Sequence, residues 1–332
     1  CNFRVDAGPM MCPRFLSQIY LYFHHRKFRA RAREARSFAG RRIISIGNLS
    51  MGGTGKTPLV EMLAREALKR GHRPMVVLRG YKGSTSGLVT DGQNVKMAFA
   101  EAGDEAMLFT QTPGLRVAVG RDRASVIDQF GGDSTLIFLD DAFQNPSVKR
   151  QVDLVLIDAS IPENKFRVFP CGKFREGLEA LSRASAVVLT RADSKTAPEW
   201  KSRIQASFPR LRVFESTHEF AGLRPVLDRG PSASRPVTAS AFCGIGNPGA
   251  FFRMLESSGV KVQARCEFAD HYAYAEKDLL MLRKRGGPWI TTAKDAVRLR
   301  HFPDEYLQAI WIADMRLRIT VGSKDLIDLV FD

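Results

Sequence analysis

A cluster of glycines followed by Lys-Thr, at residues 52–57, has the composition of a site that holds phosphate groups. Glycines let backbone N–H groups turn toward a phosphate because no Cβ stands in the way. Lys56 would reach the β- and γ-phosphates, and the Thr57 hydroxyl would take a place on Mg²⁺. Ser50 replaces the first glycine of the usual Gly-x-x-x-x-Gly-Lys-Thr pattern, so the loop is a variant. The predicted nucleotide-binding residues are Gly52, Gly53, Thr54, Gly55, Lys56 and Thr57.

The segments on either side of this loop support a phosphate-binding role. Ile43, Ile44 and Ile46 form a short β-branched run that is typical of a buried strand. Apolar residues at helical spacing follow over residues 59–67. A helix that begins directly after the glycines adds partial positive charge, which favours an anion. The alternative is an ordinary glycine turn with a chance lysine, and the flanking strand and helix argue against it.

Two adjacent carboxylates, Asp140 and Asp141, follow a predicted hydrophobic strand at residues 135–139. This arrangement resembles the Walker B element, in which a carboxylate holds Mg²⁺ or its waters. Neighbouring buried carboxylates repel each other, so a cation would stabilise the pair. An Asp-Asp turn without any metal is the alternative. We predict Thr57, Asp140 and Asp141 as the Mg²⁺ ligands.

Two further polar residues are predicted to lie at the carboxyl ends of strands. Asp122 follows a predicted strand at residues 115–119 and begins a helix. It could cap that helix, face a ligand, or do both, because ligands bind at this edge of open α/β sheets. His271 lies between Asp270 and Tyr272 after another predicted strand. A lone histidine is more often structural, so its spacing alone does not assign it a role.

The order of predicted elements indicates the fold class. Strands alternate with helices from residue 42 to residue 190, which predicts a parallel sheet with helices on both faces. A second alternation begins near residue 237, and a chain of 332 residues suggests about two domains. We therefore expect an α/β protein with a P-loop NTPase-type sheet and a second, smaller α/β domain.

The N-terminal segment is strongly basic. The chain has a net charge of +15, and residues 1–42 contribute ten Lys/Arg against two Asp/Glu. Such a segment attracts phosphates, whether of nucleic acid or of an anionic lipid surface. Residues 13–37 are predicted to form an amphipathic helix whose apolar part spans about nine residues, well short of the ~20 that cross a bilayer. We expect it to lie in a membrane interface, the alternative being a surface helix packed on the globular domain.

Seven short motifs occur in one order along the chain. They are Gly47-Asn48-Leu49-Ser50, Gly52-Gly53-Thr54-Gly55-Lys56-Thr57-Pro58, Arg79-Gly80-Tyr81, Gly103-Asp104-Glu105, Asp140-Asp141-x-Phe143-Gln144, Asp270-His271-Tyr272 and Lys294-Asp295. Taken together, these motifs resemble the tetraacyldisaccharide 4'-kinase (lipid A 4'-kinase) family, and the resemblance runs from about residue 13 to the end of the chain. It implies an ATP- and Mg²⁺-dependent transfer of phosphate to the 4'-hydroxyl of a tetraacyl glucosamine disaccharide 1-phosphate.

The same resemblance implies residue roles. Asp122 matches the catalytic aspartate, and His271 matches the histidine that supports it across the cleft. Lys56 matches the P-loop lysine that acts in catalysis. Asp140 and Asp141 match the Mg²⁺ carboxylates. The substrate or transition-state contacts would come from Arg175 and Glu176.

The resemblance also implies location and domain order. The protein would act as a peripheral protein at the cytoplasmic face of the bacterial inner membrane, on a lipid disaccharide, without nucleic acid or an obligate protein partner. Two linker strands, near residues 211–220 and 310–319, would join two α/β/α domains. The implied segments are a basic helix at 1–40, a P-loop kinase domain at 41–220, a smaller α/β domain at 221–308, and a linker strand with a returning helix at 309–332.

Some positions depart from the family pattern. Ala142 and Asn145 replace the usual glycine and histidine, and Gln151 and Gly177 are also changed. A competing hypothesis is a membrane-associated P-loop ATPase or GTPase switch without a lipid acceptor. Its support is the stretch at residues 190–193, Thr-Arg-Ala-Asp, which distantly resembles the element by which GTPases read guanine. Nucleic-acid binding by the basic segment is the weakest hypothesis, because no nucleic-acid module is recognised.

Overall fold

The computed structural model describes residues 14–80, 85–227 and 235–332. Tyr81 of the Arg-Gly-Tyr motif and residues 1–13 of the basic segment lie outside the described residues. The strands are β1 (Arg42–Asn48), β2 (Pro74–Leu78), β3 (Gly87–Thr90), β4 (Arg116–Val119), β5 (Leu136–Asp140), β6 (Val152–Asp158), β7 (Ala186–Thr190), β8 (Arg212–Pro225), β9 (Thr238–Cys243), β10 (Lys261–Glu267), β11 (Trp289–Thr292) and β12 (Ile310–Val321). The helices are α1 (Arg14–Arg33), α2 (Lys56–Lys69), α3 (Phe99–Ala102), α4 (Asp104–Phe109), α5 (Arg123–Phe130), α6 (Ala197–Ser207), α7 (Pro248–Ser257), α8 (Glu276–Arg285), α9 (Ala293–Leu299), α10 (Asp304–Leu307) and α11 (Ser323–Phe331), with short 3₁₀ turns at Glu163–Lys165 and Leu178–Arg183.

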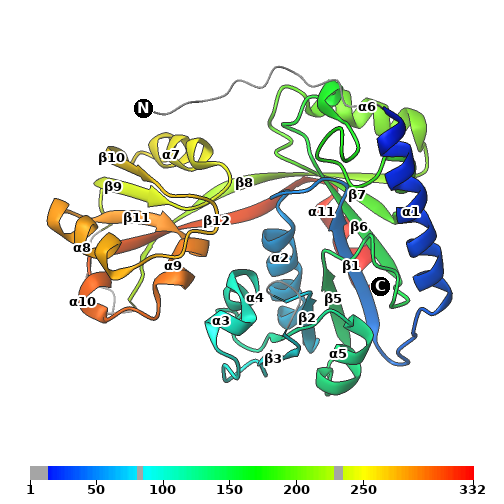
Figure 1. Ribbon diagram of the computed structural model, residues 1–332, viewed down its shortest axis with the longest axis horizontal. Helices are drawn as coiled ribbons and strands as arrows, with labels where there is room; N and C mark the ends of the chain where they lie inside the picture. Colours follow the sequence, from blue (N-terminus) through cyan, green and yellow to red (C-terminus); the bar gives the residue numbers. More distant parts are fainter. Residues whose placement is uncertain (1–13, 81–84, 228–234) are drawn as a thin grey trace.

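The described strands form one 12-stranded sheet in the order β10-β9-β11-β12-β8-β7-β6-β1-β5-β2-β4-β3. β1 lies between β6 and β5 and is parallel to both. Its β-branched residues are buried because helices cover both faces of a parallel sheet. The predicted α/β fold class is confirmed, and Figure 1 shows helices on both sides of the sheet.

The two long strands β8 and β12 pair with each other in antiparallel fashion and join the two halves of the molecule. β12 also pairs with β11 of the smaller half, and β8 pairs with β7 of the larger half. Figure 1 shows this pair running from one half to the other. The two expected sheets are therefore continuous, because the linker strands hydrogen-bond to both. We use "large half" for β1 to β7 with their helices and "small half" for β9 to β11 with theirs.

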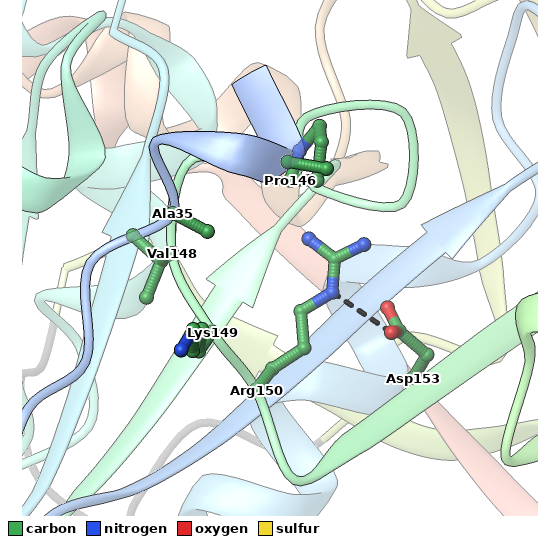
Figure 2. Close-up of a pocket in the computed structure, with 7 residues that line it drawn as sticks. Ala35, Pro146, Val148, Lys149, Arg150 and Asp153 are labelled. Atoms are coloured by element: carbon green, nitrogen blue, oxygen red, sulfur yellow. Dashed lines mark hydrogen bonds and ion pairs between the residues drawn. The ribbon is translucent and has the colours of Figure 1, made fainter. Parts of the chain in front are cut away.

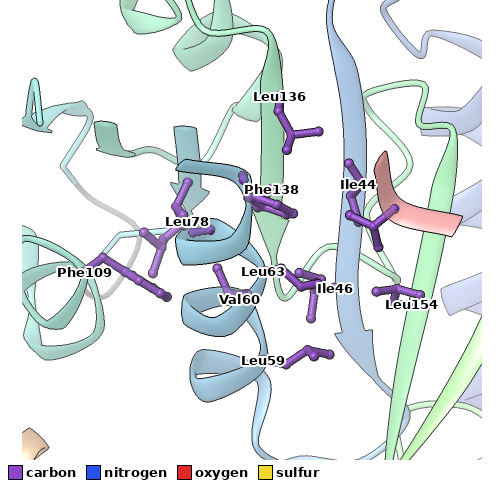
Figure 3. Packing of buried hydrophobic residues seen from close by; sticks show 14 of the residues in the cluster. Ile44, Ile46, Leu59, Val60, Leu63, Leu78, Phe109, Leu136, Phe138 and Leu154 are labelled. Carbon is purple, nitrogen blue, oxygen red and sulfur yellow. The ribbon is translucent and has the colours of Figure 1, made fainter. Parts of the chain in front are cut away.

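The core of the large half forms where α2 packs on the sheet. Leu59, Val60 and Leu63 share one face of α2 because their spacing follows the helical repeat, and they contact Ile46 and its neighbours on β1. Figure 3 shows these side chains between the helix and the strands. α11 packs into the same cluster, and the Arg42 side chain donates hydrogen bonds to the carbonyls of Leu329 and Val330 at its end. The C-terminal helix α11 thus packs against and stabilises β1, the strand that leads into the glycine loop.

α1 lies along the large half, as Figure 1 shows, and ends at Arg33, four residues before the predicted end. One face is docked: Ser17 donates a hydrogen bond to the carbonyl of Val168, and the ring of Tyr20 contacts that of Phe169. The opposite face leaves large apolar side chains exposed. Among the described residues, none of the helices combines the length and apolarity needed to cross a bilayer. The exposed apolar residues of α1 are Phe15, Leu16, Ile19, Tyr22 and Phe23.

The close packing at the end of β1 gives a stability prediction. A Cβ at Gly47 would lie 2.5 Å from the Cβ of Phe143 and 2.9 Å from its backbone nitrogen. We expect Gly47→Ala to lower the free energy of unfolding by about 1–3 kcal/mol, the usual cost of overpacking. Gly53→Ala is the matched control, because nothing lies within 4 Å of a Cβ there. Urea unfolding measures both, and equal stabilities would contradict this packing.

Candidate active site

The glycine loop lies between β1 and α2, in the predicted order of strand, loop and helix. Gly52 and Gly55 have φ angles of 117° and 89°, in the left-handed region that favours glycine. Asn48, the last residue of β1, donates a hydrogen bond of 2.8 Å to the Thr54 hydroxyl. Lys56 is the first residue of α2. The loop is therefore held at the end of the strand, with its lysine at a helix N-terminus.

Asp141 joins the glycine loop to a more distant loop. Its carboxylate lies 3.4 Å from Lys56 Nζ and accepts hydrogen bonds of 2.8 and 2.9 Å from Arg175 Nη1. Burial alone would raise the pKa of Asp141, but the positive charges of Lys56 and Arg175 outweigh it and hold the pKa below its ordinary value. These three residues form a charged cluster that incoming phosphates and a cation could enter by exchanging ion-pair partners.

Asp140 is the residue that most clearly calls for a cation. It ends β5, it is buried, and its Oδ1 has no hydrogen-bond partner among the residues that the structure describes. Burial, together with the negative charges of Glu105 and Asp141, raises the pKa of Asp140 to about 7. A divalent cation would favour the ionised form. The described residues contain no ready cluster of three His, Cys, Asp or Glu, so such a cation would also depend on phosphate oxygens, as Mg²⁺ commonly does.

The structure separates the roles expected for Arg175 and Glu176. Arg175 faces Asp141 in the charged cluster, as described above. Glu176 is fully buried, and both of its oxygens accept hydrogen bonds of 2.9 Å from Arg183. A carboxylate that is buried and paired in this way has a structural role, so the geometry argues against direct contact between Glu176 and a substrate.

Asp122 serves as the N-cap of α5. Its carboxylate accepts hydrogen bonds from the backbone nitrogens of Ala124 and Ser125 and from the Ser125 hydroxyl. These bonds, led by that of the Ser125 hydroxyl, lower the pKa of Asp122. Asp122 follows β4, which β5 and β2 separate from β1, so roughly 14 Å of sheet lies between the two strands at about 4.8 Å per step.

His271 contacts a different carboxylate from the one expected. Its Nδ1 lies 3.1 Å from Asp104 Oδ2, whereas Asp122 is the partner that the family resemblance implies. Arg298 Nε donates a 2.7 Å hydrogen bond to the same oxygen, and Arg298 Nη1 contacts Asp295 and the Gly244 carbonyl at 3.0 Å. Desolvation of Asp104 would raise its pKa, but the hydrogen bonds and positive charge of the nearly buried Arg298 outweigh this effect and lower the pKa. Asp104 therefore stays ionised beside a histidine whose side chain is 59% exposed.

This second cluster joins the two halves and lies near the first one. Asp104 begins α4 of the large half, whereas Arg298 belongs to α9 of the small half. Glu105, which follows Asp104 on α4, and Lys294, which lies four residues before Arg298 on α9, form a further ion pair of 3.8 Å between the same helices. Glu105 is also close enough to Asp140 to raise the pKa of that carboxyl. Glu105, the neighbour of Asp104, thus lies within electrostatic range of the acidic pair that meets Lys56.

The sequence contained a signal for Asp104 but not for Arg298. Gly103-Asp104-Glu105 is among the matching family motifs, but the motif alone assigns Asp104 no role. Asp122 fits the rule that ligands bind at the carboxyl ends of strands. That rule does not predict which carboxylate a histidine far away in the sequence will contact. Arg298 lies on α9 but outside the Lys294-Asp295 motif of that helix, so its place in the cluster depends on tertiary packing.

The changed positions after Asp141 are explained by backbone contacts. Arg150 donates hydrogen bonds to the carbonyls of Ala142, Phe143 and Asn145, and its Nε bonds to Asp153 at 2.8 Å. Figure 2 shows Arg150 and Asp153 in a pocket between the segment after α1 and the loop before β6. The loop is thus held through its carbonyls, and the Asn145 side chain adds a hydrogen bond that it accepts from the backbone nitrogen of Ser147 at 3.4 Å.

Comparison with known proteins agrees with these features. The family model for tetraacyldisaccharide-1-P 4'-kinase matches residues 12–331. The tetraacyldisaccharide 4'-kinase of Geobacter metallireducens is 40% identical over 273 residues, which span 78% of this chain and 79% of that protein. The enzyme of the same name from Desulfotalea psychrophila is 33% identical, over 86% of this chain and 85% of its own length.

A solved structure is similar over nearly the whole fold. LpxK from Aquifex aeolicus, described as an apo form in complex with ATP, superimposes with a TM-score of 0.77 at 27% identity. The match covers 96% of each chain, so it includes both halves and the strands that join them. The chain belongs to the tetraacyldisaccharide 4'-kinase family.

Proposed function

We propose that this protein is an ATP-dependent kinase that phosphorylates the 4'-hydroxyl of a tetraacyl glucosamine disaccharide 1-phosphate in lipid A biosynthesis. The observation that carries the proposal is the family match over residues 12–331, combined with a glycine loop whose lysine meets Asp141. The alternative of a nucleotide switch without a lipid acceptor is not favoured. Arg191 of its guanine-like element is ion-paired with Asp158.

The glycine loop would hold the β- and γ-phosphates of ATP through its backbone N–H groups and Lys56. Thr57, Asp140 and Asp141 would hold Mg²⁺, which supplies positive charge to the phosphates when it is bound. Lys56 and Arg175 would stabilise the charge that spreads over the transferring group. The exposed residues of the loop support this arrangement, as does Asp140 Oδ1, which has no hydrogen-bond partner within the described part of the chain.

The reaction also requires a group that takes the proton of the attacking hydroxyl. We assign this role to Asp104 with His271, in place of Asp122. The hydroxyl oxygen forms a bond to the γ-phosphorus, the bond to the ADP oxygen breaks, and the proton passes to the Asp104–His271 pair. The lowered pKa of Asp104 keeps it ionised at neutral pH, and Arg298 fixes the direction of its carboxylate.

The exposed face of α1 supports peripheral attachment to the cytoplasmic face of the inner membrane. Phe15, Ile19, Tyr22 and Phe23 are exposed on this helix, and Arg26 and other basic residues follow them. Aromatic side chains in the interface and basic side chains near lipid phosphates would both favour binding. A kinase held there reaches an acylated sugar without extracting it from the bilayer.

The division of the chain is part of the same proposal. An N-terminal helix within 1–40, a kinase domain at 41–220, a smaller domain at 221–308 and a returning segment at 309–332 would form the enzyme. The antiparallel pairing of β8 with β12 between the halves, and the packing of α11 under β1, support this division.

The choice of proton acceptor can be tested with two matched substitutions. We expect Asp104→Asn to lower kcat by on the order of 100-fold, because an amide cannot accept the proton. Asp122→Asn should change kcat only a few-fold, because asparagine caps a helix about as well as aspartate. Steady-state phosphoryl transfer to detergent-dispersed lipid acceptor measures both. A larger loss in the Asp122 variant would refute the assignment.

The environment of Asp140 predicts a pH-dependent stability difference. Its folded pKa, about 7, lies above the ordinary value near 4, so ionisation destabilises the metal-free fold increasingly from about pH 4 to pH 7. Asp140→Asn removes this cost, which is up to about 4 kcal/mol. We expect the variant to have a higher free energy of unfolding than the wild type at pH 8, and we expect this difference to be smaller at pH 5.

Urea unfolding at the two pH values measures this difference, and the same measurement in the presence of ATP, with and without Mg²⁺, tests the cation. With ATP present, Mg²⁺ should stabilise the wild type more than the variant, because only the wild type keeps the Asp140 carboxylate. A stability difference that is the same at pH 5 and pH 8 would contradict the buried carboxylate, and an equal effect of Mg²⁺ on both proteins would contradict its role as a ligand.

A further inference from the structure

The buried carboxylate of Glu176 receives part of its environment from α1. His24 Nε2 lies 3.4 Å and His25 Nε2 lies 3.8 Å from Glu176 Oε1. Arg183 and Gln144 supply the other contacts, at 2.9 and 3.2 Å. Arg183 and Gln144 donate hydrogen bonds to Glu176, whereas the buried His24 Nε2 has no hydrogen-bond partner among the described residues and lies within ion-pair distance of the carboxylate. A fully buried carboxylate depends on such polar neighbours. The helix expected to bind the membrane thus completes a charge site inside the large half.

α1 also packs against Arg183, the positively charged partner of Glu176. The guanidinium of Arg183 lies 4.4 Å from the ring centre of Phe28 on α1 and 4.7 Å from that of Phe143. Contacts of a guanidinium with aromatic rings are favourable when the cation is partly desolvated. Phe143 follows Asp141 by two residues, so the same cation touches both α1 and the loop that carries the acidic pair.

Gln144 connects Glu176 to the phosphate site. Its Nε2 donates hydrogen bonds to Glu176 at 3.2 Å and to the carbonyl of Asn48 at 2.8 Å, at the end of β1. Its Oε1 accepts a hydrogen bond of 3.4 Å from Arg175, which in turn binds Asp141. Contacts therefore run without a break from α1 to the carboxylate that meets Lys56.

We propose that His24 is a positioning residue for phosphoryl transfer, and that docked α1 is part of the active-site scaffold as well as a membrane anchor. The inference rests on the proposed kinase function. His24 compensates Glu176, Glu176 holds Gln144, and Gln144 holds Arg175 against Asp141. Without His24, Glu176 would bind Gln144 more closely or bind water, and Arg175 would no longer be aligned with Asp141.

The two tasks of α1 fall on different faces of the helix. Ser17, Tyr20, His24 and Phe28 recur at intervals of three or four residues and face the protein. The exposed aromatic residues, such as Tyr22 and Phe23, lie on the other side. Substitutions can therefore remove one task and leave the other in place.

The experiment compares His24→Ala and His24→Gln with a double variant of the exposed face, Tyr22→Ser with Phe23→Ser. For each protein we would measure kcat and KM with detergent-dispersed acceptor, the Mg²⁺ concentration at half-maximal ATP binding, and flotation with vesicles of phosphatidylethanolamine and phosphatidylglycerol. Circular dichroism confirms that each variant is folded.

We expect His24→Ala to lower kcat about tenfold or more and to raise the half-maximal Mg²⁺ concentration several-fold, with unchanged flotation. His24→Gln should recover most of both, because its amide can donate to Glu176. The double variant should lose flotation and keep its kcat in detergent.

Normal kcat and normal Mg²⁺ dependence in His24→Ala would overturn the proposal, as would a loss that His24→Gln does not recover. If the wild type transfers no phosphate to the acceptor, the proposed function fails. The Mg²⁺ dependence of ATP binding still decides the role of His24 in that case, since it requires no acceptor.

Discussion

The ion pair between Lys56 and Asp141 depends on how two parallel strands are aligned. In the pairing of β1 with β5, Ile46 lies opposite Asp140, so the glycine loop and the acidic pair leave the sheet side by side. Gly47 allows the chain after Asp141 to pass closely, since a Cβ there would collide with Phe143. A shift of this register would separate the lysine from its carboxylate, and Arg175 and Gln144 would lose their alignment as well.

The small half contributes its chemistry through side chains that reach across to the large half. Arg298 fixes Asp104, which belongs to the other half, and His271 completes the pair from a backbone with a φ of 57°. β8 and β12 carry the small half on a continuous sheet, so its position relative to the glycine loop is set by backbone hydrogen bonds. The Asp104–His271 pair and the glycine loop therefore belong to one scaffold, in which the large half supplies Asp104 and the loop and the small half supplies His271 and Arg298.

Much of the large half could be predicted from the sequence, because its signals are local. The β-branched run at Ile43, the glycines before Lys56 and the strand ending at Asp140 each specify their own structure. The continuous sheet and the partner of His271 could not be predicted in this way, because they depend on pairing between segments far apart in the chain. The composition of residues 13–37 predicts an amphipathic helix but not which face of it packs on the protein. That His24 and Phe28 lie on the packed face follows only from their contacts with Glu176 and Arg183.

A kinase that holds ATP at Lys56 and a lipid sugar beside Asp104 must move the γ-phosphate of ATP to that sugar. ATP labelled at the γ-phosphate can be followed in the presence of the disaccharide acceptor, with the labelled lipid identified by mass spectrometry and phosphorus NMR. We expect label at the 4'-position of the lipid, in step with the ADP formed. Label released only as inorganic phosphate, with the acceptor unchanged, would show that the protein does not transfer phosphate to the lipid.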